Sequence, residues 1–528
     1  MLTRRELIKL GLYGGTAALH LAGNGFGSWV LADNGGKQHS PAVAPFQVPL
    51  PIPSIKQAID PNTFTGGPAP VFNDGLPTKY YEITSRQNAV QILPGKKTII
   101  WGYDGQYPGP SINAGRSARV VVRHHNALPA NTIVHRHGGH NPSPSDGSAL
   151  FSEQIPPSTA TFDSFRDFLY PNDDDVGATN WYHDHDIDFT GHNVYMGLAA
   201  FYLLDDEIED AFNLPGGPGD VPPSTQDYPF EMSLVFQDRL FDANNQLVYN
   251  PFDHDGFLGD TFLVNGAVQP KMRVYNRKYR FHILNGSNAR FYQLVLSNGM
   301  PFHVMATEGG FLKQRVDVSN FRFGMAERLE FILDFSTVKP GTSVVLNNIM
   351  QQSGGRGPDG VDPSKPTPLM RFDVEALPTG VTDNSQNPVL LRTDLPVFDP
   401  QQATQTINIE FQRSNGAWQI NGKFFDPTRI DFNVKLNSTV IWNMKNGGGG
   451  WYHPIHIHRN QFFIIDRNGR PPSPIEGGLK DTFVLAGGDQ VRAVTKFTGD
   501  NCLGPYVFHC HNLEHEDMRM MGIFNVVA

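Results

Sequence analysis

Cysteine is almost absent from this chain, since only Cys502 and Cys510 occur in 528 residues. That count excludes a fold held together by a network of disulfides. An excess of positive charge is also missing, because 42 Lys and Arg stand against 52 Asp and Glu and leave a formal net charge of -10. Proteins that bind nucleic acid through its phosphates are usually basic, so a nucleic-acid partner is not expected.

Long apolar runs and sustained helical periodicity are lacking as well. Beyond the first 32 residues, no stretch is long and apolar enough to span a bilayer, so we expect no stable membrane span. What the chain has instead is 53 Gly and 41 Pro, the turn formers that separate short strands. The composition therefore predicts a globular protein of the all-β class.

The first residues resemble an export signal. Arg4 and Arg5 precede a mildly apolar run that extends to about Leu31. Paired arginines before such a run are typical of a twin-arginine signal peptide, and the glycines in the run make it a poor membrane anchor. We expect a signal over residues 1–32, recognition by the twin-arginine export machinery, and a periplasmic or extracellular mature protein. The alternative is an ordinary basic start of a cytosolic protein.

Two Pro- and Gly-containing linkers, residues 214–220 and 377–387, divide the rest of the chain into three segments. The segments read as distant repeats, because each contains a turn, a strand, a bend and a strand that closes on Asn. Three consecutive copies of one β-sandwich are the simplest account. The expected domains are residues 46–206, 221–377 and 388–528.

Histidines gather in four short clusters, two in the first segment and two in the third. Ten of the 19 histidines belong to them: His135, His137, His183, His185, His453, His456, His458, His509, His511 and His515. On a strand, residues two apart point to the same face at a spacing of about 7 Å. The pairs 135/137, 183/185, 456/458 and 509/511 therefore present eight imidazoles. One ion cannot use eight nitrogens, but a cluster of several metal ions can.

A second kind of metal site is indicated around Cys510. This cysteine lies between two of the clustered histidines, so its side chain points to the opposite face of the strand. His515 and Met520 follow it at intervals of five residues, and His453 begins the third cluster. Two histidines, a thiolate and a distant methionine form a blue-copper electron-transfer site, whereas a structural zinc site uses four ligands and usually more cysteine. The tripeptide 509–511 would join the two sites.

Together, these motifs resemble those of the multicopper oxidases. His-x-His-Gly, His-x-His, His-Pro-x-His-x-His and His-Cys-His-x3-His-x4-Met occur in the order of that family. His-Gly-Gly at 137–139, Asn-Val-Tyr at 193–195 and Leu-Glu-His-Glu-Asp at 513–517 are most similar to the bacterial spore-coat-type laccases and bilirubin oxidases. The resemblance implies three consecutive cupredoxin-like Greek-key β-sandwich domains, with a trinuclear copper cluster between the first and the third.

The resemblance also implies how the ligands divide among four copper ions. The type 1 copper takes His453, Cys510, His515 and axial Met520. The type 2 copper takes His135 and His456. Of the type 3 pair, one ion takes His137, His183 and His511, and the other takes His185, His458 and His509. Met520 is preferred to its neighbour Met521 because it holds the family's offset from Cys510.

Two carboxylates are candidates for moving protons. Asp146 and Glu516 match positions that lie near the cluster in similar laccases and assist oxygen reduction there. Making water from dioxygen consumes protons, so acids near the cluster are chemically reasonable. The alternatives are an Asp-Gly turn residue for Asp146 and a surface acid for Glu516.

The leading hypothesis is a laccase-like, copper-dependent oxidoreductase with dioxygen as acceptor. It would take electrons one at a time from a phenol, aromatic amine or bilin near His515 and use four of them to make water. The alternative enzyme is a metallo-oxidase for Mn(II) or Cu(I), which needs carboxylates or methionines near His515. A metal-free cupredoxin-fold scaffold predicts gaps in the motifs, and none of the ligands is missing.

Overall fold

The computed structural model describes residues 39–528, apart from 149, 151–153, 160–162, 174 and 500–501. The export signal expected over residues 1–32 lies outside these described residues. In the described part, strands dominate and form mixed sheets of Greek-key type, so the predicted all-β class with cupredoxin-like sandwiches is confirmed. None of the described helices is long and apolar enough to cross a membrane.

The first sandwich contains two four-stranded sheets, ordered β2-β1-β4-β6 and β3-β8-β7-β5. β1 pairs antiparallel with β2 and parallel with β4, and the intervening β3 belongs to the other sheet. The strands are β1 (Thr78–Val90), β2 (Thr98–Tyr103), β3 (Ile112–Gly115), β4 (Arg119–Asn126), β5 (Val134–His137), β6 (Phe165–Tyr170), β7 (Ala178–Asp184) and β8 (Ala199–Asp205).

The second sandwich is larger and has one sheet ordered β12-β11-β9-β14-β19-β16-β17, with β10 added to β9, and another ordered β13-β23-β20-β15-β18. β21 and β22 form a separate two-stranded sheet. The strands are β9 (Glu231–Phe241), β10 (Leu247–Val248), β11 (Thr261–Val264), β12 (Ala267–Val268), β13 (Lys271–Tyr275), β14 (Lys278–Asn285), β15 (Tyr292–Leu296), β16 (Phe302–Thr307), β17 (Gly310–Val318), β18 (Asn320–Phe323), β19 (Arg328–Asp334), β20 (Ser343–Asn348), β21 (Met350–Gln351), β22 (Gly360–Val361) and β23 (Thr367–Glu375).

The third sandwich has two five-stranded sheets, ordered β25-β24-β27-β31-β29 and β26-β33-β32-β28-β30. The strands are β24 (Ala403–Ser414), β25 (Ala417–Ile420), β26 (Phe432–Lys435), β27 (Thr439–Asn446), β28 (His453–Ile457), β29 (Phe463–Arg467), β30 (Thr482–Leu485), β31 (Gln490–Lys496), β32 (Gly504–Cys510) and β33 (Met521–Val527). Each of the three sandwiches lies inside one of the three expected ranges, whose end points stay predictions.

The asparagines that close the sequence repeats have the same structural role in each sandwich. Asn126, Asn285 and Asn446 end β4, β14 and β27, and all three are fully buried. Each amide nitrogen donates to backbone carbonyls of the chain that follows: Ala130 and Ile155, Arg290 and Phe323, and Trp451 and Ala486. Buried carbonyl groups need hydrogen-bond donors. In each sandwich, one asparagine side chain supplies them to the irregular segment that follows the strand.

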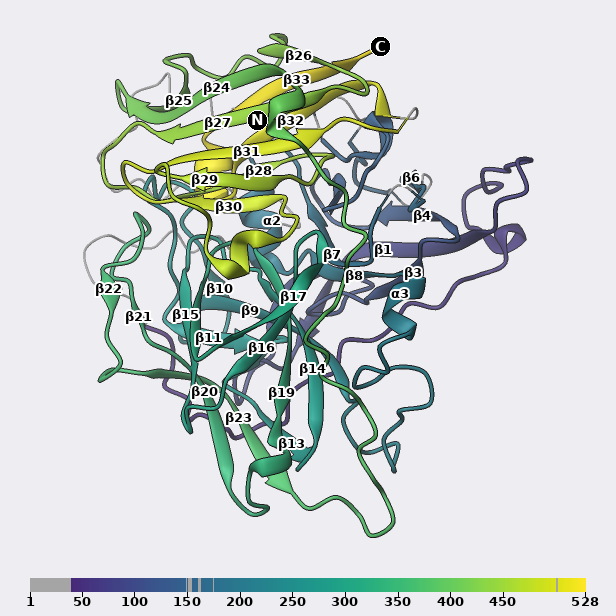
Figure 1. Cartoon of the computed structure of the whole chain (residues 1–528), viewed down its shortest axis with the longest axis vertical. Helices are drawn as coiled ribbons and strands as arrows, with labels where there is room; N and C mark the ends of the chain where they lie inside the picture. Colours follow the sequence, from purple (N-terminus) through teal and green to yellow (C-terminus); the bar gives the residue numbers. More distant parts are fainter. Residues whose placement is uncertain (1–38, 149, 151–153, 160–162, 174, 500–501) are drawn as a thin grey trace.

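Each sandwich encloses its own apolar core. Ile83 and Tyr202 belong to the first core, Phe281 and Phe372 to the second, and Trp442 and others to the third. Figure 1 shows the third sandwich in yellow and light green at one end of the molecule, the second in teal and green at the other, and the first in blue and purple at their side. The molecule therefore has three separate cores that meet at interfaces.

Short helices fill the junctions between the sandwiches. α2 of the first sandwich packs against α4 of the third, where the backbone N–H of Gly191 donates to Asp517 at 3.0 Å. A Cβ atom at Gly191 would lie 2.5 Å from the hydroxyl of Tyr249, which belongs to the second segment. Residues of all three segments are therefore closely packed around Gly191. The helices are α2 (Thr190–Met196), α3 (Glu207–Asp210) and α4 (Leu513–Asp517), with 3-10 turns η1 (Pro61–Thr63), η2 (Ser143–Ser145), η3 (Phe335–Thr337), η4 (Pro400–Gln402) and η5 (Pro474–Gly477).

Candidate metal centres

Four strands, together with the residues directly after three of them, carry the paired histidines to the junction of the first and third sandwiches. β5 pairs with β7 so that His135 lies opposite His183, and β28 pairs with β32 so that His456 lies opposite His509. The strand registers thus place histidine beside histidine inside each sandwich. The two sheets then face each other, and their imidazoles meet in a single buried group.

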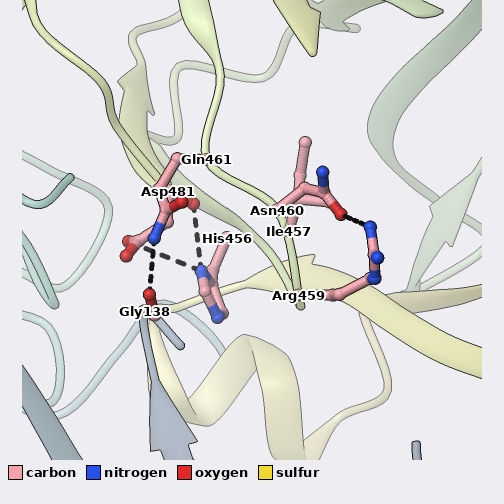
Figure 2. Close-up of a pocket in the computed structure, with 7 residues that line it drawn as sticks. All are labelled: Gly138, His456, Ile457, Arg459, Asn460, Gln461 and Asp481. Carbon is pink, nitrogen blue, oxygen red and sulfur yellow. Dashed lines mark hydrogen bonds and ion pairs between the residues drawn. The ribbon is translucent and has the colours of Figure 1, made fainter. Parts of the chain in front are cut away.

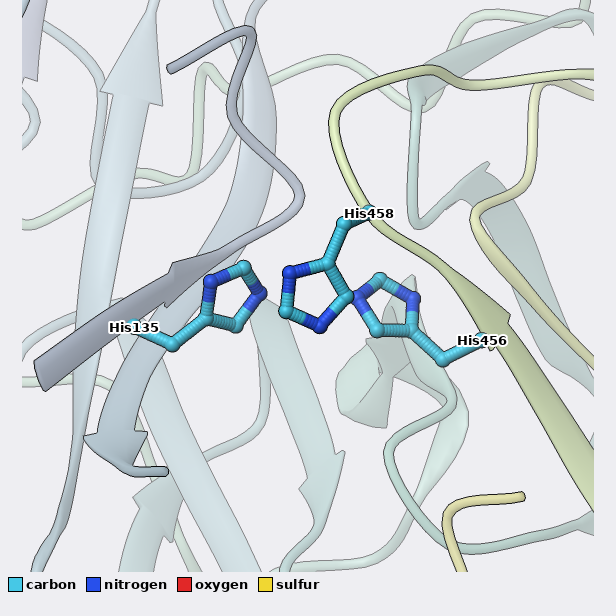
Figure 3. Close-up of side chains that lie close together, drawn as sticks. All are labelled: His135, His456 and His458. Carbon is cyan, nitrogen blue, oxygen red and sulfur yellow. The ribbon is translucent and has the colours of Figure 1, made fainter. Parts of the chain in front are cut away.

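The imidazoles of the two sandwiches are in direct contact. The ring of His135 stacks on that of His458 with centroids 3.9 Å apart, and His137 stacks on His456 at 3.6 Å. Figure 3 shows His135 reaching from one side toward His456 and His458 on the other. The Nε2 atom of His509 lies 3.3 Å from that of His185 and 3.2 Å from that of His458. No single sandwich could build this group.

The free nitrogen atoms of these rings fit a metal cluster. The Nδ1 atoms of His135, His183 and His456 contact the backbone carbonyls of Asp146, Asp184 and Asp481, and their Nε2 atoms are buried without a hydrogen-bond partner. Burial lowers the pKa of all three imidazoles well below the usual range, so they are neutral and offer lone pairs. A buried nitrogen without a hydrogen-bond partner costs free energy of folding, and imidazole nitrogens bind copper well. The three Nε2 atoms therefore fit copper ligands.

The structure also shows which histidines lie close enough together to bind the same metal ion. His185, His458 and His509 offer ligand atoms that all lie within 4.8 Å of one another. His135 forms such groups both with His456 and His458 and with His137 and His183. The resemblance assigns the first trio to one type 3 copper. The division of the remaining ligands among the cluster ions stays a prediction.

The second site lies on the other face of β32. The Nδ1 atoms of His453 and His515 are each 3.5 Å from the sulfur of Cys510, and all three residues are buried. Burial raises the pKa of the Cys510 thiol, so a cation beside the sulfur is needed to hold it as the thiolate. Two imidazoles around one sulfur are the donor set of a blue-copper site.

Met520, the predicted axial ligand, is tied to this site through its backbone. Its backbone N–H donates to the carbonyl of His515 at 2.9 Å, and its carbonyl accepts from the N–H of Cys510 at 3.1 Å. Its side chain is buried in the same apolar cluster as Cys510. Met521 instead packs with Val507 on the other side of the sheet.

The two candidate carboxylates lie buried against the histidine cluster. Asp146 follows η2 in a turn, and its Oδ2 atom is 2.7 Å from Nδ1 of His458. Glu516, on α4, is 3.2 Å from Nδ1 of His509 and 3.5 Å from Nε2 of His185. Burial raises the pKa of Asp146. Burial also acts to raise the pKa of Glu516, but the two neighbouring imidazoles outweigh it and hold that pKa below its usual range.

A third carboxylate at the cluster has no signal in the sequence. Asp481, in the loop before β30, has its Oδ1 atom 3.1 Å from Nε2 of His137 and 3.7 Å from Nδ1 of His456. It lies far along the chain from His137 and in no motif with a recognised spacing, so only the folded chain reveals it. Trp418 was missed for the same reason, and its ring lies 4.0 Å from that of His515.

Two further histidines and the second cysteine lie outside both sites. His192, on α2, packs its ring edge-on against Trp101 at 4.9 Å. His140 has its backbone N–H and its ring directed at Asp175. Cys502 is buried, and neither it nor Cys510 is in a disulfide. The cluster geometry therefore involves the predicted histidines and not these neighbours in sequence.

Comparisons with known proteins agree with this arrangement. Multicopper oxidase family models match residues 84–209 and 397–528. A bilirubin oxidase from Albifimbria verrucaria is 36% identical over 93% of this chain and 83% of that protein, and a laccase from Bacillus subtilis is 33% identical over 84% and 93%.

Solved structures show the same likeness in three dimensions. A laccase from Pediococcus acidilactici superimposes with a TM-score of 0.78 at 30% identity, covering 94% of this chain and 97% of that one. Multicopper oxidases hold four copper ions, one of type 1, one of type 2 and a binuclear type 3 pair, and the two donor groups described above suit them. The chain belongs to the multicopper oxidase family and is a copper-dependent oxidoreductase of the laccase-like kind that uses dioxygen.

Proposed function

We propose that this oxidase takes electrons one at a time from small aromatic reductants, namely phenols, aromatic amines or bilins, and uses them for the four-electron reduction of dioxygen to water. The relatives named laccase and bilirubin oxidase support this class of donor. The single observation that carries the proposal is the position of Cys510. Its sulfur lies between two imidazoles of one site, while its neighbours in sequence, His509 and His511, belong to the other.

The chain connects the two sites through one short covalent path. When bound, copper supplies the one-electron Cu(I)/Cu(II) couple at the first site and the oxygen chemistry at the second. Strand β32 turns the side chain of Cys510 to one face and those of its neighbours to the other. The peptide backbone of residues 509–511 therefore joins the two donor sets without any intervening solvent.

Electrons that enter near His515 must pass through the side chains that bury it. The side chain of His515 is 0% exposed, Trp418 above it is 2% exposed, and Trp451 is 9% exposed. Trp451 packs edge-on against Trp418, and the guanidinium of Arg356 lies 4.3 Å above its ring. The Arg356 side chain is 57% exposed, so a flat aromatic donor can stack on its guanidinium. Direct contact between donor and the His515 ring is closed off.

The carboxylates near Trp451 and His515 count against the metallo-oxidase alternative, because they are already engaged in hydrogen bonds or ion pairs. A cation site for Mn(II) or Cu(I) needs carboxylates or thioethers that are free to bind. Asp255 already accepts the indole N–H of Trp451 at 2.9 Å and contacts Arg356 at 3.2 Å. Glu514 accepts bonds from Tyr249 and from the backbone of Phe257.

Asp146 and Glu516 are proposed to hold and pass the protons that oxygen reduction consumes. Each has a carboxylate oxygen within 3.2 Å of an imidazole nitrogen of the cluster, at His458 and His509. Asp146 follows η2 in the first sandwich, and Glu516 lies on α4 in the third. Each of these two sandwiches therefore places one acid against the cluster.

Export by the twin-arginine route is proposed for this protein, with the mature enzyme outside the cytoplasm. The support is the sequence of residues 1–32 alone, with Arg4 and Arg5 before a mildly apolar run. Cell fractionation of the parent and of an Arg4→Lys, Arg5→Lys variant tests this. The parent should be found outside the cytoplasm and the variant inside, and equal distribution would contradict the proposal.

A panel of electron donors tests the proposed reaction. Copper-loaded enzyme is supplied with a phenol, bilirubin, Mn(II) or Cu(I), and oxygen uptake is measured. The aromatic donors should be consumed faster than either metal ion, and the reverse order would favour the metallo-oxidase. In parallel, Cys510→Ser should lose the intense visible absorption of a copper–thiolate bond and stop turnover with every donor.

A further inference from the structure

Asp481 holds one cluster histidine from each of two sandwiches. Its Oδ1 atom lies 3.1 Å from Nε2 of His137, which belongs to the first sandwich. Its backbone carbonyl lies 3.0 Å from Nδ1 of His456, which belongs to the third. Figure 2 shows Asp481 beside His456 in a pocket that Gly138 also lines. One residue therefore contacts both members of the stacked His137–His456 pair.

The carboxylate of Asp481 is itself held by the second sandwich, which supplies none of the predicted copper ligands. Arg328 begins β19 and is fully buried. Its Nη1 atom donates to Oδ1 of Asp481 at 2.8 Å, and its Nη2 atom donates to Oδ2 in a two-pronged contact. Its Nε atom donates to the carbonyl of Thr179 on β7 at 3.0 Å. The guanidinium thus touches the first and third sandwiches together.

The backbone after His137 is shaped to admit this ion pair. Gly138 has φ +101°, a conformation that side chains rarely adopt. A Cβ atom there would lie 2.7 Å from Nη2 of Arg328 and 3.0 Å from Oδ2 of Asp481. The first glycine of the His-Gly-Gly motif therefore leaves the space that the pair fills.

The contact decides which nitrogen of His137 remains for a metal. Because Nε2 faces Asp481 and the hydroxyl of Thr482 at 3.2 Å, Nδ1 is the atom left buried without a partner. His456 has the opposite arrangement, with Nδ1 engaged and Nε2 free. A carboxylate that accepts from a ligating imidazole sets both its tautomer and the direction of its ring.

We propose that the Arg328–Asp481 pair is a positioning device through which the copper-free second sandwich orients His137 in the trinuclear cluster. The pair contacts no reductant, so the inference holds for whichever donor the enzyme uses. It requires only that the cluster binds copper, which the family establishes. Changing a residue of this kind typically weakens metal binding by about 10–100-fold.

A neighbouring ion pair provides a matched control. Lys480 and Glu308 are also buried and also join the third sandwich to the second, with Nζ 2.8 Å from a carboxylate oxygen. Within the described residues, neither member of this pair contacts a cluster histidine. If a buried charge between the sandwiches were all that mattered, the two pairs would be equivalent.

The experiment compares two double variants, Arg328→Met with Asp481→Leu and Lys480→Met with Glu308→Gln. Replacing both partners of a pair avoids leaving one buried charge uncompensated, so both proteins should fold. Copper per chain is measured under increasing chelator, together with the blue absorption and the electron paramagnetic resonance signal of the type 2 copper. The first variant should lose cluster copper at about 10–100-fold lower chelator concentration, with its blue absorption retained.

The control variant should hold its copper as the parent does. Equal copper retention by both variants, or equal loss from both, would overturn the proposal. A crystal structure of each copper-free variant gives a second readout that does not depend on activity. The His137 ring should be turned or in two orientations only when the Arg328–Asp481 pair is removed, and an unchanged ring would also overturn the proposal.

Discussion

A buried imidazole can offer a metal only the nitrogen atom that its protein neighbours leave free. At His135, His183 and His456 the backbone takes Nδ1 and leaves Nε2, whereas at His137 a carboxylate takes Nε2 and leaves Nδ1. At His453 and His515 it is Nδ1 that faces the cysteine sulfur. The two copper sites are therefore built from the same side chain used through different atoms, as the surrounding hydrogen bonds dictate.

Changing Glu516 tests the proposed proton path at the residue scale. Glu516→Gln keeps the shape of the side chain but cannot carry a proton, so turnover should fall by about 100-fold, within the range of general acid–base catalysis. Copper content and the visible spectrum should not change. Glu514→Gln is the control, since that carboxylate lies on the same helix but contacts Tyr249 and Asn288. Equal rates for the two variants would remove the role of Glu516.

His124 is predicted to limit stability in acid although it lies in neither copper site. Burial lowers the pKa of His124 to about 3, among the rings of Tyr103 and Phe168. The unfolded chain binds this proton below about pH 6.5, and the folded chain does not. Between about pH 6.5 and pH 3, the free energy of unfolding should therefore fall as the pH falls, by about 1.4 kcal/mol for each pH unit.

His124→Phe should remove this contribution, because a phenyl ring fills the same space and takes up no proton. The variant should gain stability over the parent as the pH is lowered from 6.5 to about 4, as measured by urea unfolding of the copper-loaded proteins. His303→Phe is a control on a side chain that is only partly buried. A constant difference between His124→Phe and the parent at every pH would contradict the prediction.

At the scale of strands and turns, short-range spacing predicted which histidines gather in one buried group. The His-x-His pair 135/137 lies within β5, and the other three pairs begin on β7, β28 and β32 and end one residue past them. The alternation of side chains along a strand makes residues two apart share a face. The predicted reversal of Cys510 relative to its neighbours follows from the same alternation. The strand-closing asparagines were visible as a repeat, but their common task of binding the crossing segments became clear only from their partners.

Gly138→Ala tests the turn that follows β5. The added methyl group meets Asn180, Arg328 and Asp481 at 3.0 Å or less, and the residue must also keep a positive φ. We expect a loss of about 1–3 kcal/mol in the free energy of unfolding and weaker copper retention at the cluster. Gly299→Ala is the control, because that glycine also has a positive φ but has nothing near its Cβ. Equal copper retention by the two variants would contradict the steric argument.

At the scale of the whole molecule, the cluster is a joint between sandwiches. Its imidazoles come from the first and third, and Asp481 and Arg328 bring the second into contact with them. α2 and α4 meet at the same junction. Because the ligands are supplied by separately cored units, bound metal ties these units together and contributes to the stability of the assembled chain.

Removing copper should therefore lower the temperature of unfolding. A ligand that binds only the folded chain stabilises it by about 4 kcal/mol when its concentration is 1,000 times its dissociation constant. Scanning calorimetry of copper-loaded and chelated protein should show the lower midpoint for the chelated form, and added copper should restore it. An identical midpoint in both forms would show that the junction holds without metal.

The sequence by itself determined the family, the all-β class and the identity of the expected copper ligands. It could do so because strand periodicity and the His-Cys-His tripeptide act over a few residues, where spacing along the chain is also spacing in space. The tertiary structure decided which nitrogen each imidazole presents and how deeply His515 is covered, and it alone revealed the second sandwich's contact with the cluster. The Arg328–Asp481 contact spans 153 residues and the His137–Asp481 contact spans 344, distances at which only folding brings side chains together.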